Sequence, residues 1–312
     1  MDSIDAGIIR ELSGPDGNYP WNVREPFSQM ALKLRTDQKT IWRRIRNLER
    51  ARILEGREVV ANPYFIGHQP IRMILNVANH DKTKDNVISQ LIHVDGTVLI
   101  LDWQGPTLHL LLFCEKSERA ISRKIGLVSS ISGCDEPIVL RNSEALGFYE
   151  CKLKASMKDL LIMRSLRKNP RKRVQQIAKE VHLSNRTVER RISALTANHA
   201  FFHMVRMGFQ NVEGLTCSAF VFYSDQANKL TGDAEVASRL QRLVFSATKG
   251  NRISQFTFVC RNASESEEMK RWLQTIDGIE KVMMGLVTKY ILVTDWLDFE
   301  MEQMISRQVR RD

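Results

Sequence analysis

Two segments of the chain combine side chains that hydrogen-bond to base edges with side chains that neutralise phosphates. In the DNA major groove, arginine pairs with guanine, while asparagine and glutamine pair with adenine. We expect DNA contacts from Gln38, Lys39, Thr40, Trp42, Arg43 and Arg46 in the first segment, and from Asn185, Arg186, Thr187, Glu189, Arg190 and Ser193 in the second. The alternative is the solvent-exposed face of an ordinary helix.

The two segments are copies of one pattern, 147 positions apart. In each copy a short helix is followed by a turn, opened by Asp37 or Ser184, and then by a second helix. The corresponding pairs include Thr40 and Thr187, Arg43 and Arg190, and Leu48 and Leu195. This arrangement is typical of a helix-turn-helix whose last helix enters the major groove.

Apolar side chains at helical spacing define the buried side of each last helix. They are Ile41, Ile45 and Leu48 in the first copy and Val188, Ile192 and Leu195 in the second. Spacings of four and three residues place them on one face and leave Arg43 and Arg190 outside. The alternating stretches 54–60 and 201–207 that follow are interpreted as two-stranded wings.

The net charge of +10 is concentrated on the repeated motif. Residues 35–57 contain eight lysines and arginines against three acids, and residues 164–191 contain ten against two. Such an excess favours a polyanionic partner. The second copy also has a basic loop in which Arg171, Lys172 and Arg173 are predicted to contact phosphate. The alternative is a loop that is basic for solubility.

Three positions of the last helices leave a choice open. Arg44 and Arg191 lie beside the buried isoleucines, so each can contact DNA or hold a neighbouring carboxylate. Trp42 can contact DNA or pack on the adjacent helix. Because Glu189 stands at the position equivalent to Trp42, the two helices are expected to contact different bases.

The remainder of each half repeats as well. The patterns predict strands at 71–77, 97–102, 108–114 and 138–140 with helices at 85–92 and 118–131, then strands at 215–223, 244–248, 253–260 and 282–293 with helices at 234–243 and 265–276. This order is that of a ferredoxin-like α/β sandwich. The sequence therefore predicts an internally duplicated α+β protein. Its domains are winged helix-turn-helix units at 1–68 and 153–212 and sandwiches at 69–152 and 213–312.

This order of elements, with the stretch from Gln176 to Leu195, resembles the leucine-responsive/AsnC family of transcription regulators. The resemblance implies a sequence-specific regulator that binds double-stranded DNA, here as a pseudo-dimer within one chain, with further homo-oligomers. The family's effector hairpin has a Gly-x-x-Asp motif, whereas the matching stretches that begin at Gly105 and Gly250 lack the acid. Binding of free amino acids is therefore not expected, and any small-molecule effector is expected between the sandwiches, near these glycines.

Two other functions share this architecture. A DNA compactor with little sequence preference would use the same basic faces. Fused two-unit proteins of this kind also resemble siroheme decarboxylases, but the histidine-, arginine- and Trp-Pro-containing tetrapyrrole segment of those enzymes is not found in either sandwich. The sequence has no Gly-rich phosphate loop, HExxH or Gly-x-Ser-x-Gly motif. We therefore expect no enzymatic activity and no cofactor.

The remaining composition predicts a cytoplasmic protein. The five cysteines show no CxxC spacing, which is typical of reduced, buried thiols. His199 and His203 are four residues apart, but no third ligand is near in sequence, so no metal site is expected. The start has no apolar signal core, and no apolar run approaches the roughly 20 residues of a membrane span.

Overall fold

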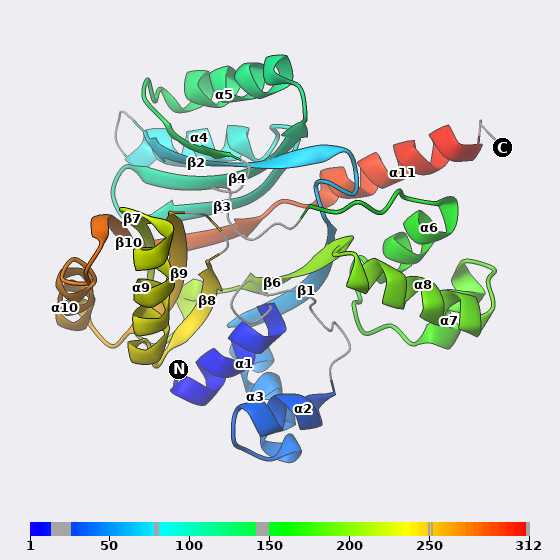
Figure 1. The fold of residues 1–312 in the computed structure, drawn as a ribbon, viewed down its shortest axis with the longest axis horizontal. Helices are drawn as coiled ribbons and strands as arrows, with labels where there is room; N and C mark the ends of the chain where they lie inside the picture. Colours follow the sequence, from blue (N-terminus) through cyan, green and yellow to red (C-terminus); the bar gives the residue numbers. More distant parts are fainter. Residues whose placement is uncertain (14–25, 78–80, 142–149, 249, 251, 310–312) are drawn as a thin grey trace.

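The computed structural model describes residues 1–13, 26–77, 81–141, 150–248, 250 and 252–309, and Figure 1 shows their arrangement. The first half contains α1 (Ser3–Ser13), α2 (Phe27–Lys33), α3 (Gln38–Arg50), β1 (Leu54–Ala61), β2 (His68–Asn76), α4 (Asp81–Leu91), β3 (Thr97–Trp103), β4 (Thr107–Glu115), α5 (Glu118–Ser132) and β5 (Ile138–Arg141). Its helices α1 to α3 form the first helix-turn-helix, β1 follows them, and the elements from β2 to β5 form the first sandwich.

The second half repeats this order. It contains α6 (Met157–Leu166), α7 (Val174–Glu180), α8 (Asn185–Ala197), β6 (Phe201–Met207), a 3₁₀ turn (Phe209–Asn211), β7 (Leu215–Tyr223), α9 (Gln226–Arg239), β8 (Leu243–Ala247), β9 (Ile253–Cys260), α10 (Ala263–Leu273), β10 (Ile279–Leu292) and α11 (Asp295–Val309). The pairs α2 and α7, α3 and α8, and β2 and β7 have the same lengths and a common shift of 147 positions. The internal duplication is therefore confirmed.

The strands of both sandwiches form one eight-stranded sheet with the order β5-β2-β4-β3-β10-β7-β9-β8. Each half has the antiparallel order of a ferredoxin-like fold, and the halves are joined where β3 pairs with β10, with Leu101 opposite Tyr290. Helices α4 and α5 cover the outer face of one half and α9 and α10 cover that of the other (Figure 1). The predicted α+β class and both ferredoxin-like sheets are confirmed.

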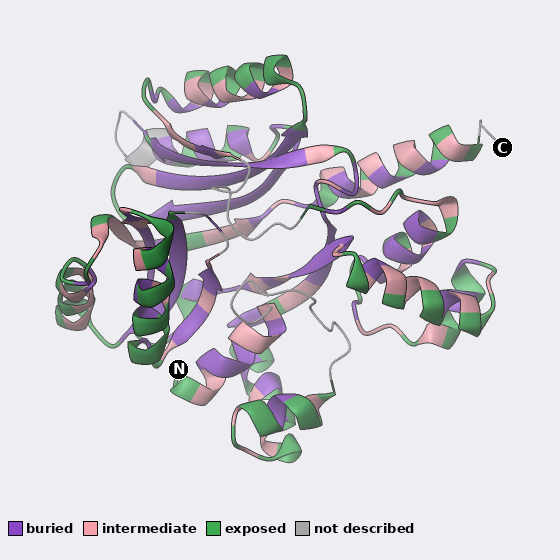
Figure 2. Ribbon diagram, in the orientation of Figure 1, coloured by how far each residue is buried: buried purple, intermediate pink, exposed green. Residues whose placement is uncertain are grey.

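The inner faces of the two half-sheets pack against each other. The ring of Phe220 on β7 lies 4.8 Å from the ring of His109 on β4 and 6.0 Å from that of Trp103 on β3, measured between centroids. Buried residues therefore line both sides of each half-sheet (Figure 2). The burial of apolar surface between the halves stabilises the joined sheet.

The expectation that each helix-turn-helix has its own two-stranded wing is wrong. β1 pairs antiparallel with β6, from Ala61 opposite Phe201 to Leu54 opposite Met207, so each copy contributes one strand to a shared ribbon. The physical reason is the chain path. The strand after β1 is β2, which enters the sandwich, so β1 finds its partner in the equivalent strand of the other copy.

Two helices differ from the sequence prediction. Helix α9 begins at Gln226 instead of residue 234, because the Asp225 side chain accepts a hydrogen bond from the backbone N–H of Asn228 (2.8 Å) and caps it earlier. Helix α11 has no counterpart among the described residues of the first half, and the sequence pattern does not predict it. It lies along α6 in Figure 1 and buries Leu297, Met301 and Ile305.

Candidate nucleic-acid interface

Polar caps fix the start of both recognition helices, α3 and α8. The Asp37 carboxylate accepts a hydrogen bond from the backbone N–H of Thr40 (2.8 Å), and the Ser184 hydroxyl accepts one from that of Thr187 (3.2 Å). The hydroxyl of Thr40 also donates to Asp37 (2.7 Å), and these bonds hold the pKa of that carboxyl below its usual value. Thr40 and Thr187, both predicted to contact DNA, thus take part in the caps.

The exposed faces of α3 and α8 are those that the apolar spacing predicts. Ile41, Ile45 and Leu48 are buried under α3, and Val188 and Leu195 are buried under α8. The predicted contact residues that are exposed are Gln38, Lys39, Trp42, Arg43, Arg46, Asn185, Arg186, Glu189, Arg190 and Ser193. The structure therefore gathers them on one face of each helix, while Thr40 and Thr187 are half-buried.

Trp42 is 51% exposed, and its ring is covered by the Arg46 guanidinium, 4.7 Å from the ring centroid. A guanidinium over an aromatic face is attracted by the negative face of the ring. The pair forms a flat surface on α3, and α8 has no matching pair, because Glu189 replaces Trp42 and Ser193 replaces Arg46.

Arg44 and Arg191 bind carboxylates of their own helix-turn-helix. The Arg44 guanidinium lies 2.9 Å from the Asp5 carboxylate and 2.7 Å from that of Asp2. Arg191 lies 3.5 Å from Asp159, the residue equivalent to Asp5. These ion pairs attach each recognition helix to the first helix of its unit.

Two of the three basic residues in the loop between α6 and α7 contact other side chains of the protein. The Arg171 guanidinium lies 4.2 Å from the ring centroid of Phe27, at the start of α2 in the other helix-turn-helix. Lys172 forms an ion pair with Glu180 (2.8 Å). Arg173 is exposed and comes directly before α7, so it is the best placed of the three for a phosphate.

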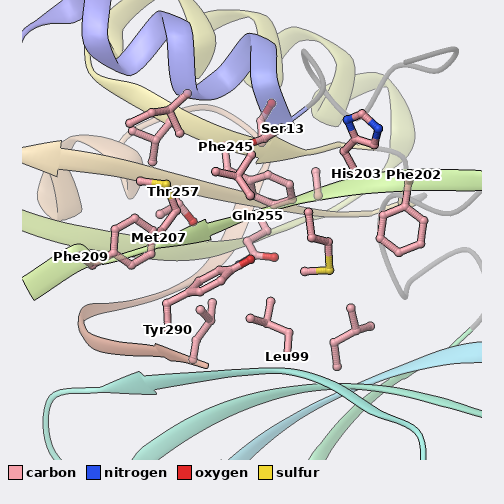
Figure 3. Close-up of a pocket in the computed structure, with 18 of the residues that line it drawn as sticks. Ser13, Leu99, Phe202, His203, Met207, Phe209, Phe245, Gln255, Thr257 and Tyr290 are labelled. Atoms are coloured by element: carbon pink, nitrogen blue, oxygen red, sulfur yellow. The ribbon is translucent and has the colours of Figure 1, made fainter. Parts of the chain in front are cut away.

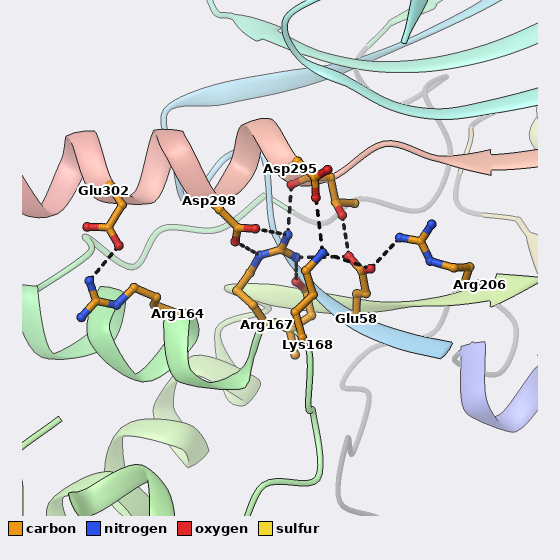
Figure 4. Close-up of polar contacts among 10 residues, drawn as sticks. Glu58, Arg164, Arg167, Lys168, Arg206, Asp295, Asp298 and Glu302 are labelled. Atoms are coloured by element: carbon orange, nitrogen blue, oxygen red, sulfur yellow. Dashed lines mark hydrogen bonds and ion pairs between the residues drawn. The ribbon is translucent and has the colours of Figure 1, made fainter. Parts of the chain in front are cut away.

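A buried ionic cluster that the sequence did not predict connects the second helix-turn-helix to the shared ribbon. Arg167, at the end of α6, is 2% exposed and donates from Nε to the Asp298 carboxylate on α11 (2.7 Å) and from Nη2 to the carbonyl oxygen of Thr294 (3.0 Å). Figure 4 shows this cluster, which we call the Arg167 cluster and which comprises Glu58, Arg167, Lys168, Arg206, Thr294, Asp295 and Asp298.

Glu58 of β1 is the shared acceptor of the Arg167 cluster. Its carboxylate lies 2.7 Å from Arg206 on β6, 3.2 Å from Lys168 and 3.7 Å from Arg167, and it accepts a hydrogen bond from the Thr294 hydroxyl. Burial alone would raise the pKa of Glu58, but this hydroxyl and the cations outweigh burial and lower it. The cluster joins residues more than 100 positions apart, which sequence spacing does not reveal.

His199 and His203 do not share a helical face, because α8 ends at Ala197 and His203 lies in β6. Among the described residues no group of three or more histidine, cysteine, aspartate or glutamate side chains is placed to hold a metal ion. The five cysteines are free and buried, as predicted. No helix within the described ranges is both long and apolar enough to cross a bilayer.

One protein-family model matches the chain. It describes a winged helix-turn-helix DNA-binding domain and covers residues 158–199, from α6 to the end of α8. The second copy of the motif is thus similar to winged helix-turn-helix DNA-binding domains. No curated protein matches the chain.

Solved structures match the chain over its whole length or over one half. The crystal structure of the siroheme decarboxylase NirDL is 11% identical, covers 97% of this chain and 99% of its own, and has a TM-score of 0.57. Its complex with an iron-uroporphyrin III analogue has a TM-score of 0.55 at the same identity and coverage. AsnC of E. coli is 18% identical, with 44% of this chain and 94% of its own covered and a TM-score of 0.34. The tandem architecture expected from the family resemblance is therefore confirmed.

The expectation that the chain is not an enzyme is contradicted by these matches. Two structures that match almost the entire chain are of an enzyme, a siroheme decarboxylase. The sequence lacks familiar catalytic motifs, but this absence does not exclude an enzyme. One fold supports unrelated functions, and catalytic groups need not follow a short sequence motif.

Proposed function

We propose that the protein is a sequence-specific transcription regulator that binds double-stranded DNA through both recognition helices. The observation that carries this proposal is the equivalence of α3 and α8. Both are capped at their N-terminal ends, both bury one apolar face and both expose polar and basic side chains at matching positions. A recognition helix presents this kind of surface to the major groove.

In this proposal Arg43 and Arg190 contact base edges, and Arg173 contacts a phosphate. Gln38 and Asn185 stand one position after the caps, where side chains of a recognition helix reach the bases. Because Trp42 and Arg46 have no equivalent on α8, the two half-sites differ in sequence. The preferred operator is an imperfect palindrome.

The proposal includes a pseudo-dimer within one chain, further association between sandwiches, a small-molecule effector and a cytoplasmic location with access to DNA. The shared β1–β6 ribbon supports the first point, since it holds the two helix-turn-helix units together as a dimer interface would. The described part of the structure contains an interior cavity that suits the effector.

Selection from a random duplex library by the purified full chain tests the proposal. We expect one enriched sequence with two related half-sites, bound at least about 1,000-fold more tightly than scrambled DNA at the same salt concentration. Equal affinity for selected and scrambled duplexes would show that the protein is an architectural DNA-binding protein and not a sequence-specific regulator.

A second candidate function is that of a siroheme decarboxylase-like enzyme, favoured by the whole-chain fold match to NirDL. At 11% identity the match concerns the fold, so the activity is tested directly. The full chain is incubated with siroheme without oxygen, and the absorption spectrum and product masses are followed. Loss of 44 mass units per released carbon dioxide would favour the enzyme, whereas an unchanged tetrapyrrole with specific operator binding favours the regulator.

A further inference from the structure

A cavity of about 100 Å³ lies between the inner faces of the two half-sheets (Figure 3). Its wall contains side chains of β3, β4, β6, β8, β9 and β10, together with Ile9 and Ser13 of α1. Neither Gly105 nor Gly250 lines it. The cavity is therefore distinct from the position expected for an effector from the family resemblance.

Most of the cavity wall is apolar. Leu99, Leu111, Val244 and Phe245 contribute hydrocarbon surface from both half-sheets. An interior space of roughly 150 Å³ with such walls accommodates benzene. A cavity of about 100 Å³ thus suits a compact organic molecule with few non-hydrogen atoms.

A buried guanidinium occupies one side of this apolar space. Arg72 of β2 is 4% exposed and donates from Nη1 to the side-chain oxygen of Gln255 on β9. The Gln255 amide nitrogen in turn donates to the Ser218 hydroxyl (3.2 Å), so the amide is held with its oxygen toward Arg72. Burial lowers the pKa of Arg72 to about 9, which leaves it positively charged at pH 7.

Tyr290 of β10 supplies a second polar group. Its ring packs edge-on against Phe209 at 5.5 Å between centroids, and its side chain lines the cavity (Figure 3). Burial raises the pKa of this phenol, so it remains a neutral donor. The neighbouring His203 is neutral at pH 7, because burial first, and then Arg57 and Arg171, lower its pKa to about 3.

We propose that this cavity binds a short aliphatic carboxylate, with the acid group at Arg72 and Tyr290 and the hydrocarbon part against Leu99, Leu111 and Phe245. A guanidinium presents several N–H donors in a planar fork, so it can hold Gln255 and a carboxylate together. The phenol donates to the same acid group. The apolar wall favours a branched hydrocarbon chain over a polar one.

The position of the cavity gives the ligand a route to both DNA-binding units. Ile9 and Ser13 belong to the first helix of one unit, and Phe202 and Met207 belong to the β6 strand of the shared ribbon. A ligand that contacts both elements and fits one relative position of the two DNA-binding units better than another shifts the equilibrium toward that position. This regulatory consequence rests on the proposed function, but binding itself does not.

Calorimetry on the full chain without DNA tests the site, with propionate, isobutyrate, isovalerate and 4-methylvalerate as probes. We expect at least one to bind, and the amide of that acid to bind at least about tenfold more weakly, because it lacks the charge. Tyr290→Phe should weaken carboxylate binding about threefold to tenfold. Tyr64→Phe, a half-buried tyrosine outside the cavity, should leave it unchanged.

The outcomes separate the two proposals. Absence of binding by all four acids, equal binding of acid and amide, or unchanged binding in Tyr290→Phe would overturn the carboxylate site. Thermal melting of Tyr290→Phe without ligand shows that the variant is folded. The chain could bind the carboxylate and yet show no preference for any DNA sequence. That result would support the cavity site and contradict the proposal of a sequence-specific regulator.

Discussion

Neighbouring arginines on each recognition helix have different roles because a helix turns by about 100° per residue. Arg43 and Arg190 are exposed, whereas Arg44 and Arg191 point back to carboxylates of the same unit. Helical spacing predicts the exposed pair, but it leaves the role of the other pair open. The partners of Arg44 are 39 and 42 positions away, so local spacing did not reveal them.

The first prediction concerns base contacts. Arg43→Ala and Arg190→Ala should each weaken binding to the selected operator by about 1–3 kcal/mol. They should weaken binding to scrambled DNA much less, because a lost base contact removes discrimination between sequences. Fluorescence anisotropy on both duplexes measures this. Arg123→Ala, an exposed arginine on α5, is the control. Equal losses on both duplexes would make the two arginines phosphate contacts.

The second prediction concerns the basic loop. Arg173→Ala should weaken operator and scrambled DNA alike and reduce the slope of log affinity against log salt by roughly one, since one phosphate contact is lost. Lys172→Ala should have a smaller effect on the slope, because Lys172 is paired with Glu180. A larger slope change for Lys172 than for Arg173 would reverse this assignment.

The third prediction concerns acid stability. The folded pKa of Glu58 is lowered, so its contribution is complete above the unfolded pKa of about 4.3 and is lost as the pH falls through the lower folded pKa. Glu58→Gln should be less stable near pH 7, by about 1–3 kcal/mol, because the buried Arg167 and the partly exposed Lys168 and Arg206 lose a shared carboxylate. Urea unfolding at pH 7 and pH 3 should show this difference shrinking; a constant difference would count against the assignment.

At the scale of elements, the repeated helices and most sandwich strands could be predicted, because their apolar spacing and caps are local. The bounds of β7 and β9 coincide with the prediction. The pairing of β1 with β6 could not be derived, since alternation marks a strand but does not identify its partner. Helix α11 was missed because its apolar stripe packs on α6, about 140 positions earlier, and the part of the first half that the structure describes holds no counterpart.

The fourth prediction tests the contact between α11 and α6. Met301 is fully buried there, so Met301→Ala should lower the free energy of unfolding by about 2–5 kcal/mol. Phe299→Ala on the same helix removes a side chain that is 66% exposed and should change stability by less than about 0.5 kcal/mol. Equal effects in thermal or urea unfolding would contradict this packing.

At the scale of the whole molecule, the two halves are related but not equivalent. The sheet is joined through β3 and β10, so β5 and β8 remain as its two ends. The central arginine of the Arg167 cluster is also present in one copy only, since Ser13 stands at the position equivalent to Arg167. A dimer of identical chains cannot differ in this way, and duplication within one chain allowed the two sides to diverge.

The fifth prediction follows from this asymmetry. One chain should protect both half-sites of an operator whose centres are roughly 10 base pairs apart or a multiple of that. Arg43→Ala should weaken protection of one half-site and Arg190→Ala that of the other. Hydroxyl-radical footprinting measures the protection of each half-site separately. Protection of a single half-site by the unaltered chain would exclude the two-headed model.

The shared β1–β6 ribbon also affects how the protein is made. The ribosome releases β1 about 147 residues before β6, and at about 5–20 residues per second this strand waits on the order of 7 to 30 seconds for its partner. During that interval a strand edge with several apolar side chains has no permanent partner, and edges of this kind associate with other chains. The duplication that places both DNA-binding units in one polypeptide therefore makes the nascent first half dependent on timely synthesis of the second.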